Sequence, residues 1–320
     1  MMDSGFHSRK LNSVYSLPRM KRRYEVWFLR CGLPDGSGAW WFRYLLMNPG
    51  RHAVDNMSAR RQFQVWATWF PRNENPQSFI VEFPFEHLEW SARGEAPFYL
   101  RIAGNGFEEN HCWGNLAADG HAISWDLRLR SNFSSVLSDK GWIGFSRSSH
   151  SDAEFSGEIT FDGKKIAGTP LGFGVQGHNC GYRHRTYWRW AHAHFTRPGG
   201  GASTIEALVY DLPLGLMFRN VVLWHEGKKT VLRRVKEQEV VREEERLKWV
   251  LSGIAPDGSR AELSVEGLAP GIHRLPYRKT DGSGTFPVAN ASLARATLRL
   301  GSGEVLENDC GAVLEMGGES

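Results

Sequence analysis

Residues 121–130 read HAISWDLRLR, and this stretch decides the fold class. Its four apolar side chains, from Ile123 to Leu129, alternate with polar ones. Successive side chains of a strand point to opposite faces, so this alternation predicts a strand with one buried and one solvated face. Residues 157–165, GEITFDGKK, predict a further strand that ends in an Asp-Gly turn.

Similar runs fill the chain on both sides of this stretch. The first half contains YEVWFLRC from Tyr24 and AWWFRYLLMN from Ala39, and the second half contains YWRWAHAHF at 187–195. The charged segment 233–248 lacks a clean helical stripe, so it predicts two solvent-facing strands. Many short strands separated by turns, together with 13 Trp and 35 Gly, favour sandwiches or barrels.

We therefore predict an all-β protein with two domains. Residues 1–23 are polar, basic and without a hydrophobic period, which predicts a disordered tail. The two stretches that follow have similar strand patterns, and the Gly-rich segment 167–177 lies between them. This places an N-terminal β domain at 24–170 and a C-terminal β domain at 171–320.

Composition and charge argue against several classes of protein. The 320 residues carry a formal net charge of +4, with 41% hydrophobic and 23% charged residues, which excludes an intrinsically disordered chain. No basic stripe marks the strand-rich region, so we expect no nucleic-acid partner. No apolar run suggests a spanning helix, and the start shows no secretory signal.

Cysteine usage and the basic tail bear on location. The four cysteines are widely spaced and fit neither a zinc site nor a disulfide framework, which favours a reducing cytoplasm. The basic residues of 1–23 allow peripheral contact with the inner face of a membrane. No obligatory protein partner is predicted.

Three sequence motifs were weighed for a cofactor or a catalytic centre. Residues 172–177, GFGVQG, match Gly-x-Gly-x-x-Gly. A nucleotide-binding loop also needs a following helix and an acidic residue about twenty positions on, whereas a loop and a strand are predicted to follow here. Gly-x-Ser-x-Gly and His-Glu-x-x-His motifs are absent from the sequence. We therefore predict no cofactor.

Histidines and aromatic residues are most concentrated in residues 177–195, GHNCGYRHRTYWRWAHAHF. In a strand, Trp188, Trp190, His192 and His194 share one face because their positions have equal parity. Indole rings form flat apolar walls, and imidazole exchanges protons near neutral pH. The pattern suits a pocket for a large unsaturated ligand, in which the rings also stabilise a developing cation.

Two other interpretations of these residues stay open. A packed barrel interior would use the histidines only as hydrogen-bond partners of their neighbours. His192 and His194, with His178 or His225, could instead bind zinc or iron, although no carboxylate stands beside them in the sequence pattern.

The stretch 157–195 resembles the central segment of the carotenoid 1,2-hydratase, AttH and tocopherol-cyclase-like group. In that group an Asp-Gly turn and a Gly-rich approach lead to an acidic residue or its equivalent, then His, Asn, Trp and Gly, and then a Trp-rich strand. His178, Asn179 and Gly181 match this signature. Gly177 and Cys180 replace its acidic residue and its Trp. A looser similarity extends over residues 24–318.

The resemblance implies two tandem lipocalin-like antiparallel β-barrels with a cavity for an isoprenoid- or polyketide-like molecule. It also implies proton-initiated cyclisation, hydration or isomerisation without a redox cofactor. A carboxylate missing at Gly177 leaves Glu206 or Asp211 as replacement acids. The candidate catalytic residues are His178, Asn179, His192 and His194, and the candidate ligand-binding residues are Tyr187, Trp188, Trp190, Tyr210, Trp224 and His225.

Three functions are compatible with these residues. The first is an enzyme of the lyase or isomerase type that acts on a hydrophobic unsaturated molecule. The second is a noncatalytic carrier of such a molecule on the same fold, which the absent acid at Gly177 favours. The third is a metalloenzyme that depends on the histidine cluster.

Overall fold

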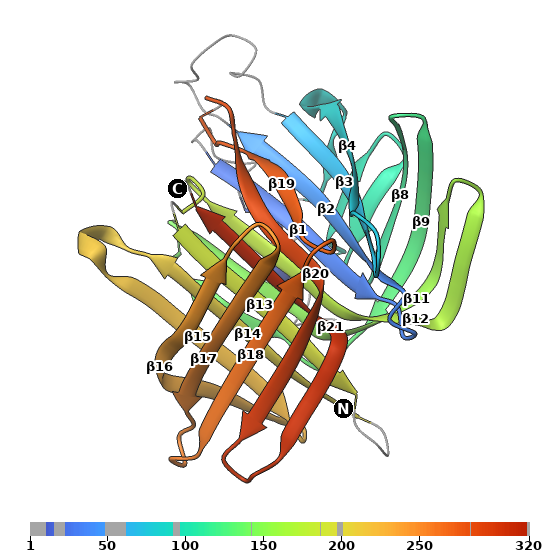
Figure 1. Ribbon diagram of the computed structural model, residues 1–320. Coiled ribbons are helices and arrows are strands. Elements are labelled where there is room, and N and C mark those ends of the chain that lie inside the picture. The colour runs from blue at the N-terminus through green and yellow to red at the C-terminus, as the bar shows by residue number, and fades with distance from the viewer. Residues whose placement is uncertain are drawn as a thin grey trace.

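Antiparallel strands arranged in two sheets build the protein, as the ribbon view shows (Figure 1). The predicted all-β class is confirmed. Two short 3-10 helices, η1 (Phe85–His87) and η2 (Pro213–Gly215), interrupt the strands, and no helix among the described residues is long and apolar enough to cross a membrane. The computed structural model describes residues 11–15, 23–48, 62–91, 97–141, 143–185, 187–196, 201–281 and 283–318.

The first sheet, which we call the N-terminal sheet, curls into a half-barrel. Its described strands run in the order β4-β3-β2-β1-β12-β11-β9-β8-β7-β6-β5, and β10 pairs with β11. The strands are β1 (Arg23–Gly32), β2 (Gly38–Asn48), β3 (Gln62–Pro71), β4 (Gln77–Pro84), β5 (Glu89–Trp90), β6 (Tyr99–Ile102), β7 (Asn105–Glu108), β8 (His111–Ala118), β9 (His121–Arg130), β10 (Ser135–Asp139), β11 (Gly144–Phe161) and β12 (Lys164–Gly181).

The second sheet closes on itself, and we call it the C-terminal barrel. Strands β13 to β18 with β21 and β20 form the ring, β18 pairs with β20 to close it, and β19 extends from β20. The tandem lipocalin-like architecture is therefore present as one closed barrel and one half-barrel. The strands are β13 (Tyr187–Thr196), β14 (Ala202–Asp211), β15 (Met217–His225), β16 (Lys228–Arg242), β17 (Arg246–Ile254), β18 (Arg260–Leu268), β19 (His273–Arg278), β20 (Thr285–Leu300) and β21 (Val305–Gly318).

The chain changes sheet after Gly181, because the whole of β12 pairs with β1 and β11. The domain boundary predicted between residues 170 and 171 thus falls inside a strand. The glycines of β12 let the backbones of neighbouring strands approach closely. A Cβ at Gly174, for example, would lie 1.9 Å from the carbonyl oxygen of Arg30. The GFGVQG segment is likewise strand rather than a phosphate-binding loop.

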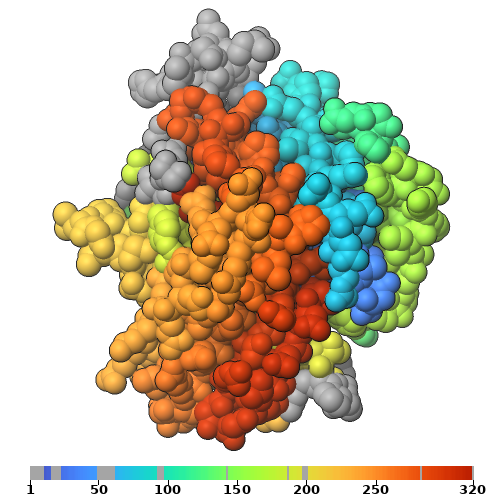
Figure 2. All heavy atoms as spheres, in the orientation of Figure 1, coloured from blue at the N-terminus to red at the C-terminus, as the bar shows by residue number. Residues whose placement is uncertain are grey.

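Strand β1 is buried on both faces because it lies between two apolar cores. Trp27 and Leu29 point into the N-terminal sheet, whereas Val26 and Phe28 point toward the C-terminal barrel. The barrel has a separate interior core around Trp249. The two halves pack directly against each other (Figure 2). The inter-barrel core includes Val26, Phe28, Trp41, Leu45, Trp66, Trp190, Leu208, Tyr210, Val222, Tyr277 and Val313.

A short segment of the predicted tail is packed into the protein. In residues 11–15, Asn12 and Val14 are buried. The Asn12 side chain bonds to Gln176 and Ser149, and its carbonyl accepts the indole N–H of Trp27 at 2.9 Å. The expected disorder is therefore wrong for 11–15, whereas residues 1–10 and 16–22 lie outside the described residues.

Arg30 links the two halves through backbone carbonyls. It is 1% exposed, and its guanidinium donates to the carbonyl of Ser292 at 2.8 and 3.0 Å, of Cys310 at 2.5 Å and of Phe173 at 3.3 Å. Burial lowers the pKa of Arg30 to about 10, so it remains charged at neutral pH. These bonds hold β1 against β20 and β21.

Candidate functional site

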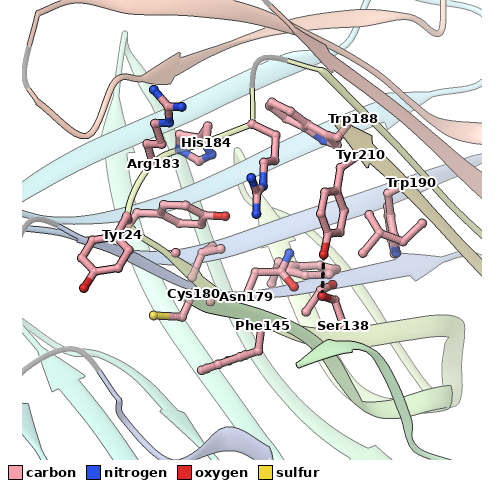
Figure 3. Close-up of a pocket in the computed structure, with 18 of the residues that line it drawn as sticks. Tyr24, Ser138, Phe145, Asn179, Cys180, Arg183, His184, Trp188, Trp190 and Tyr210 are labelled. Carbon is pink, nitrogen blue, oxygen red and sulfur yellow. Dashed lines mark hydrogen bonds between the residues drawn. The ribbon is translucent and has the colours of Figure 1, made fainter. Parts of the chain in front are cut away.

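A cavity of about 300 Å³ lies between the N-terminal sheet and the C-terminal barrel. Strands β1, β2 and β12 supply one wall, and β13, β14, β19 and β21 supply the other. The segment 182–185 and the ends of β10 and β11 complete it (Figure 3). This volume is at the lower end of the range for small-molecule sites.

Aromatic rings form a large part of the cavity wall. Phe28 stacks on Trp41 at 5.4 Å between centroids, and Trp190 meets Phe28 edge-on at the same separation. Tyr24 stacks on His184 at 4.1 Å. Flat apolar walls of this kind suit a planar unsaturated molecule, and their electron-rich faces attract a cation.

A few polar groups converge among these rings. The Oδ1 atom of Asn179 is buried and has no hydrogen-bond partner in the described part of the chain. The hydroxyls of Tyr210 and Ser138 are hydrogen-bonded at 2.9 Å (Figure 3). Burial raises the pKa of Tyr24, so its phenol stays neutral and can donate a hydrogen bond. A ligand hydroxyl or a water molecule could satisfy Asn179.

Glu315 is the one carboxylate among the described residues that line the cavity. One oxygen accepts the indole N–H of Trp188 at 3.1 Å, and the other accepts the hydroxyl of Tyr277 at 2.7 Å and the amide of Asn290 at 3.3 Å. These donors fix the orientation of the carboxyl group at the wall, where it can exchange a proton with a ligand.

The structure brings four of the predicted site residues to this cavity. Asn179, Trp188, Trp190 and Tyr210 line it. The predicted parity of β13 is confirmed, because Trp188 and Trp190 face the inter-barrel core whereas Ala191 and Ala193 face the barrel interior. The other predicted site residues are not among its lining: His178, His192, His194, Tyr187, Trp224 and His225.

His178 lies one layer behind the cavity, on the inner side of the N-terminal sheet. Its Nδ1 donates to the carbonyl of Leu11 at 2.6 Å, and its Nε2 lies 2.8 Å from Oε1 of Glu25. Both side chains are fully buried, and Trp27 stacks on the imidazole at 4.5 Å. A carbonyl only accepts, so one proton lies on Nδ1 and a second is shared between Nε2 and Glu25. No ring nitrogen is free for a ligand.

His192 and His194 lie between the barrels, farther along β13. His192 donates from Nε2 to the carbonyl of Ser151 at 2.7 Å. His194 stacks on Phe173 at 5.3 Å, and neither of its nitrogens has a hydrogen-bond partner among the described residues. Burial and the charge of Arg30 lower the pKa of His194 to about 4 and that of His192 to about 3, so both are neutral at physiological pH. A neutral imidazole is a poor acid for protonating an alkene.

The remaining predicted ligand residues have other partners. Trp224 stacks on Phe133 at 4.1 Å. His225 lies 3.2 Å from Glu304 and 3.0 Å from the hydroxyl of Ser203. Tyr187 carries the guanidinium of Arg189 over its ring. In the described ranges, no three His, Cys, Asp or Glu side chains group together as a metal site would require, so the metalloenzyme alternative lacks a ligand set.

Gly177 has a structural reason to lack a side chain. It pairs with Phe28 across the β1–β12 ladder, and a Cβ there would lie 2.2 Å from the Phe28 ring. An aromatic wall thus occupies the space that an acidic side chain would need. Of the two replacement acids, Glu206 is buried behind Trp190, which donates to it at 3.0 Å, and Asp211 accepts the backbone N–H of Tyr187. Neither lines the cavity.

Glu315 and Arg43 were missed as site residues in the sequence analysis. Both are charged residues inside apolar strand sequences, AVLEM and WWFRYLL. A charge at such a position must find a buried partner or a site, which is the signal that could have selected them.

We expect His194→Phe to be tolerated at neutral pH and to reduce acid sensitivity. The folded-state pKa of about 4 lies below the ordinary histidine pKa of 6.5, so the unfolded chain takes up the proton first and stability falls from about pH 6.5 downward. At about pH 5 the lowered pKa of His194 should reduce the free energy of unfolding by roughly 2 kcal/mol, and His194→Phe should remove this loss. Urea unfolding of both proteins at the two pH values measures the difference. If stability depended on pH equally in both proteins, the lowered pKa of His194 would be contradicted.

The fold and cavity define a protein with two lipocalin-like β units and a cavity between them. The structure is similar to that of kievitone hydratase from Nectria haematococca, with a TM-score of 0.58 and 11% identity over 97% of this chain and 94% of that one. It is also similar to a putative AttH from Nitrosomonas europaea, with a TM-score of 0.59 and 10% identity over 96% of this chain and 95% of that one.

These likenesses confirm the fold that the sequence resemblance implied. No protein-family model and no curated protein sequence matches the chain. At such low identities the likeness establishes the architecture only.

Proposed function

We propose that this protein binds a hydrophobic, unsaturated molecule in the inter-barrel cavity and catalyses its proton-initiated hydration or cyclisation. The observation that carries the proposal is the cavity itself, where aromatic rings surround a single described carboxylate, Glu315. The structural likeness to a hydratase supports the reaction class.

The cavity residues divide into three roles in this proposal. Glu315 in its protonated form gives a proton to a double bond of the ligand, and its carboxylate then takes up the proton released by the water or hydroxyl that adds to the cation; three donors fix its orientation. The rings of Trp188, Trp190 and Phe28 stabilise the carbocation by cation–π attraction. Asn179 accepts a hydrogen bond from the attacking water or internal hydroxyl, since its Oδ1 has no partner within the described ranges. A dry site strengthens each of these interactions.

A noncatalytic carrier on the same fold is the second candidate. The observation that favours it is Gly177, where the ring of Phe28 takes the place of an acidic side chain. A carrier would hold its ligand unchanged, so chemical conversion of the bound molecule separates the two functions.

Filling the cavity tests where the ligand binds. Leu208 lines the cavity, and Leu208→Trp should lower ligand occupancy at least about tenfold, because the added indole takes the ligand volume. Native mass spectrometry and organic extraction, after incubation with a metabolite extract from the source organism, measure occupancy. Leu216→Trp is the matched control, since Leu216 is 61% exposed and outside the cavity. Equal occupancy in wild type and Leu208→Trp would place the ligand elsewhere.

A further inference from the structure

Arg43 is a buried cation that has no counter-ion among the residues the structure describes. It is 3% exposed, on β2, and lines the cavity. In the described part of the chain it forms no ion pair, and its Nη1 is buried without a hydrogen-bond partner. Burying an unpaired charge is costly, and folded proteins pair such charges or use them at sites.

Two other buried arginines of this protein donate to oxygen atoms. Arg30 donates to three backbone carbonyls. Arg189 forms an ion pair with Glu237, to which its Nε donates at 2.7 Å, although its Nη1, like that of Arg43, has no partner in the described part of the chain. Arg43 instead has only ring contacts, with Cζ 4.5 Å from the centroid of Trp66 and 3.9 Å from that of Tyr277. Ring faces attract the cation but do not accept its N–H groups in the way that oxygen atoms do.

The charge balance of the cavity wall favours an anion. Arg43, Lys140, Arg183 and Arg185 line the cavity, whereas Glu315 is the one described acidic residue in its lining. The Glu315 oxygens are already engaged by Trp188, Tyr277 and Asn290. Burial and the charge of Arg43 lower the pKa of His184 to about 3, so this neighbour is neutral and the positive charge stays on the arginine.

We propose that Arg43 binds an acidic oxygen group of the ligand, so that the ligand has a planar unsaturated body and one anionic end, such as a carboxylate, sulfonate or phenolate. This inference rests on the proposed function, because it uses the same cavity. The planar guanidinium offers paired N–H donors that match two oxygens of one anion. Trp66 and Tyr277 hold the guanidinium in place, and the anion would bind on the cavity side.

Two fluorescent probes that differ in one charge test the inference. The probes are 8-anilinonaphthalene-1-sulfonate and N-phenyl-1-naphthylamine, which has the same rings without the sulfonate. The wild type should bind the sulfonate more tightly than the neutral probe. Arg43→Met should weaken the sulfonate at least about tenfold, a change of 1.4 kcal/mol, and the neutral probe less than twofold. Leu208→Trp should abolish both signals, which places the probes in the cavity.

Controls keep the test decisive. Arg128→Met removes the same charge at an exposed position on β9 and should change neither affinity. If circular dichroism shows that Arg43→Met does not fold, Arg43→Gln is tested in its place, with the same expected losses of affinity for the two probes. Equal weakening of both probes, or unchanged sulfonate binding, would overturn the role of Arg43 and leave the proposed function standing. Binding of neither probe to the wild type would overturn both proposals.

Discussion

Glu25→Ala is expected to destabilise the protein by about 3–5 kcal/mol, because it breaks a fully buried pair and leaves one member without its partner. Glu25 accepts from His178 and from the backbone N–H of Tyr15 at 2.8 Å, and both side chains of the Glu25–His178 pair are 0% exposed. Urea unfolding followed by tryptophan fluorescence measures the change.

The matched variant Glu25→Gln separates lost hydrogen bonds from lost volume. Tyr15 N–H and His178 Nε2 both bond the same oxygen, Oε1, so the Gln amide can keep only one of these two bonds, and we expect a cost of about 1–3 kcal/mol, below that of Glu25→Ala. Both variants should retain ligand binding after correction for the folded fraction. A fully stable Glu25→Gln protein that binds ligand but has lost turnover would show that the pair is catalytic, contrary to our account.

Glu315→Gln is expected to slow turnover at least about 100-fold while changing ligand affinity by less than about threefold. The amide is nearly the same size as the carboxyl group, and Tyr277 and Asn290 can reorient to bond it, but it cannot carry a proton at neutral pH. Single-turnover rates and ligand titrations on the molecule recovered from the wild type measure the two effects.

Glu307→Gln is the control for Glu315→Gln, because Glu307 is exposed on the same strand, β21, and lies outside the cavity. It should leave both rate and affinity unchanged. Full activity in Glu315→Gln would exclude this residue from proton transfer.

Much of the fold follows from local patterns in the sequence. The alternation in 121–130 produces β9, whose buried residues begin at Ile123 and end at Leu129 as predicted. The charged segment 233–248 lies in β16 and β17, as two strands. The boundary predicted between residues 170 and 171 lies within β12, where glycines let neighbouring strands approach closely.

The candidate site could be predicted only in part. Parity assigned Trp188 and Trp190 to the correct face of β13, but it also grouped them with His194. A strand rises about 3.3 Å per residue, so His194 lies roughly 13 Å from Trp190 and beyond the cavity. Glu315 reaches the cavity from the opposite end of the chain, through β21 pairing with β13. No local pattern encodes that pairing.

Conversion of the bound molecule is the most direct test of the central claim. The molecule recovered from the cavity is incubated with wild type in ¹⁸O-labelled water, and the product is analysed by mass spectrometry and chromatography. We predict either a gain of one labelled water or an isomer of unchanged mass with a new retention time, and loss of both in Glu315→Gln. A molecule that keeps its mass and retention time would contradict catalysis and identify the protein as a carrier.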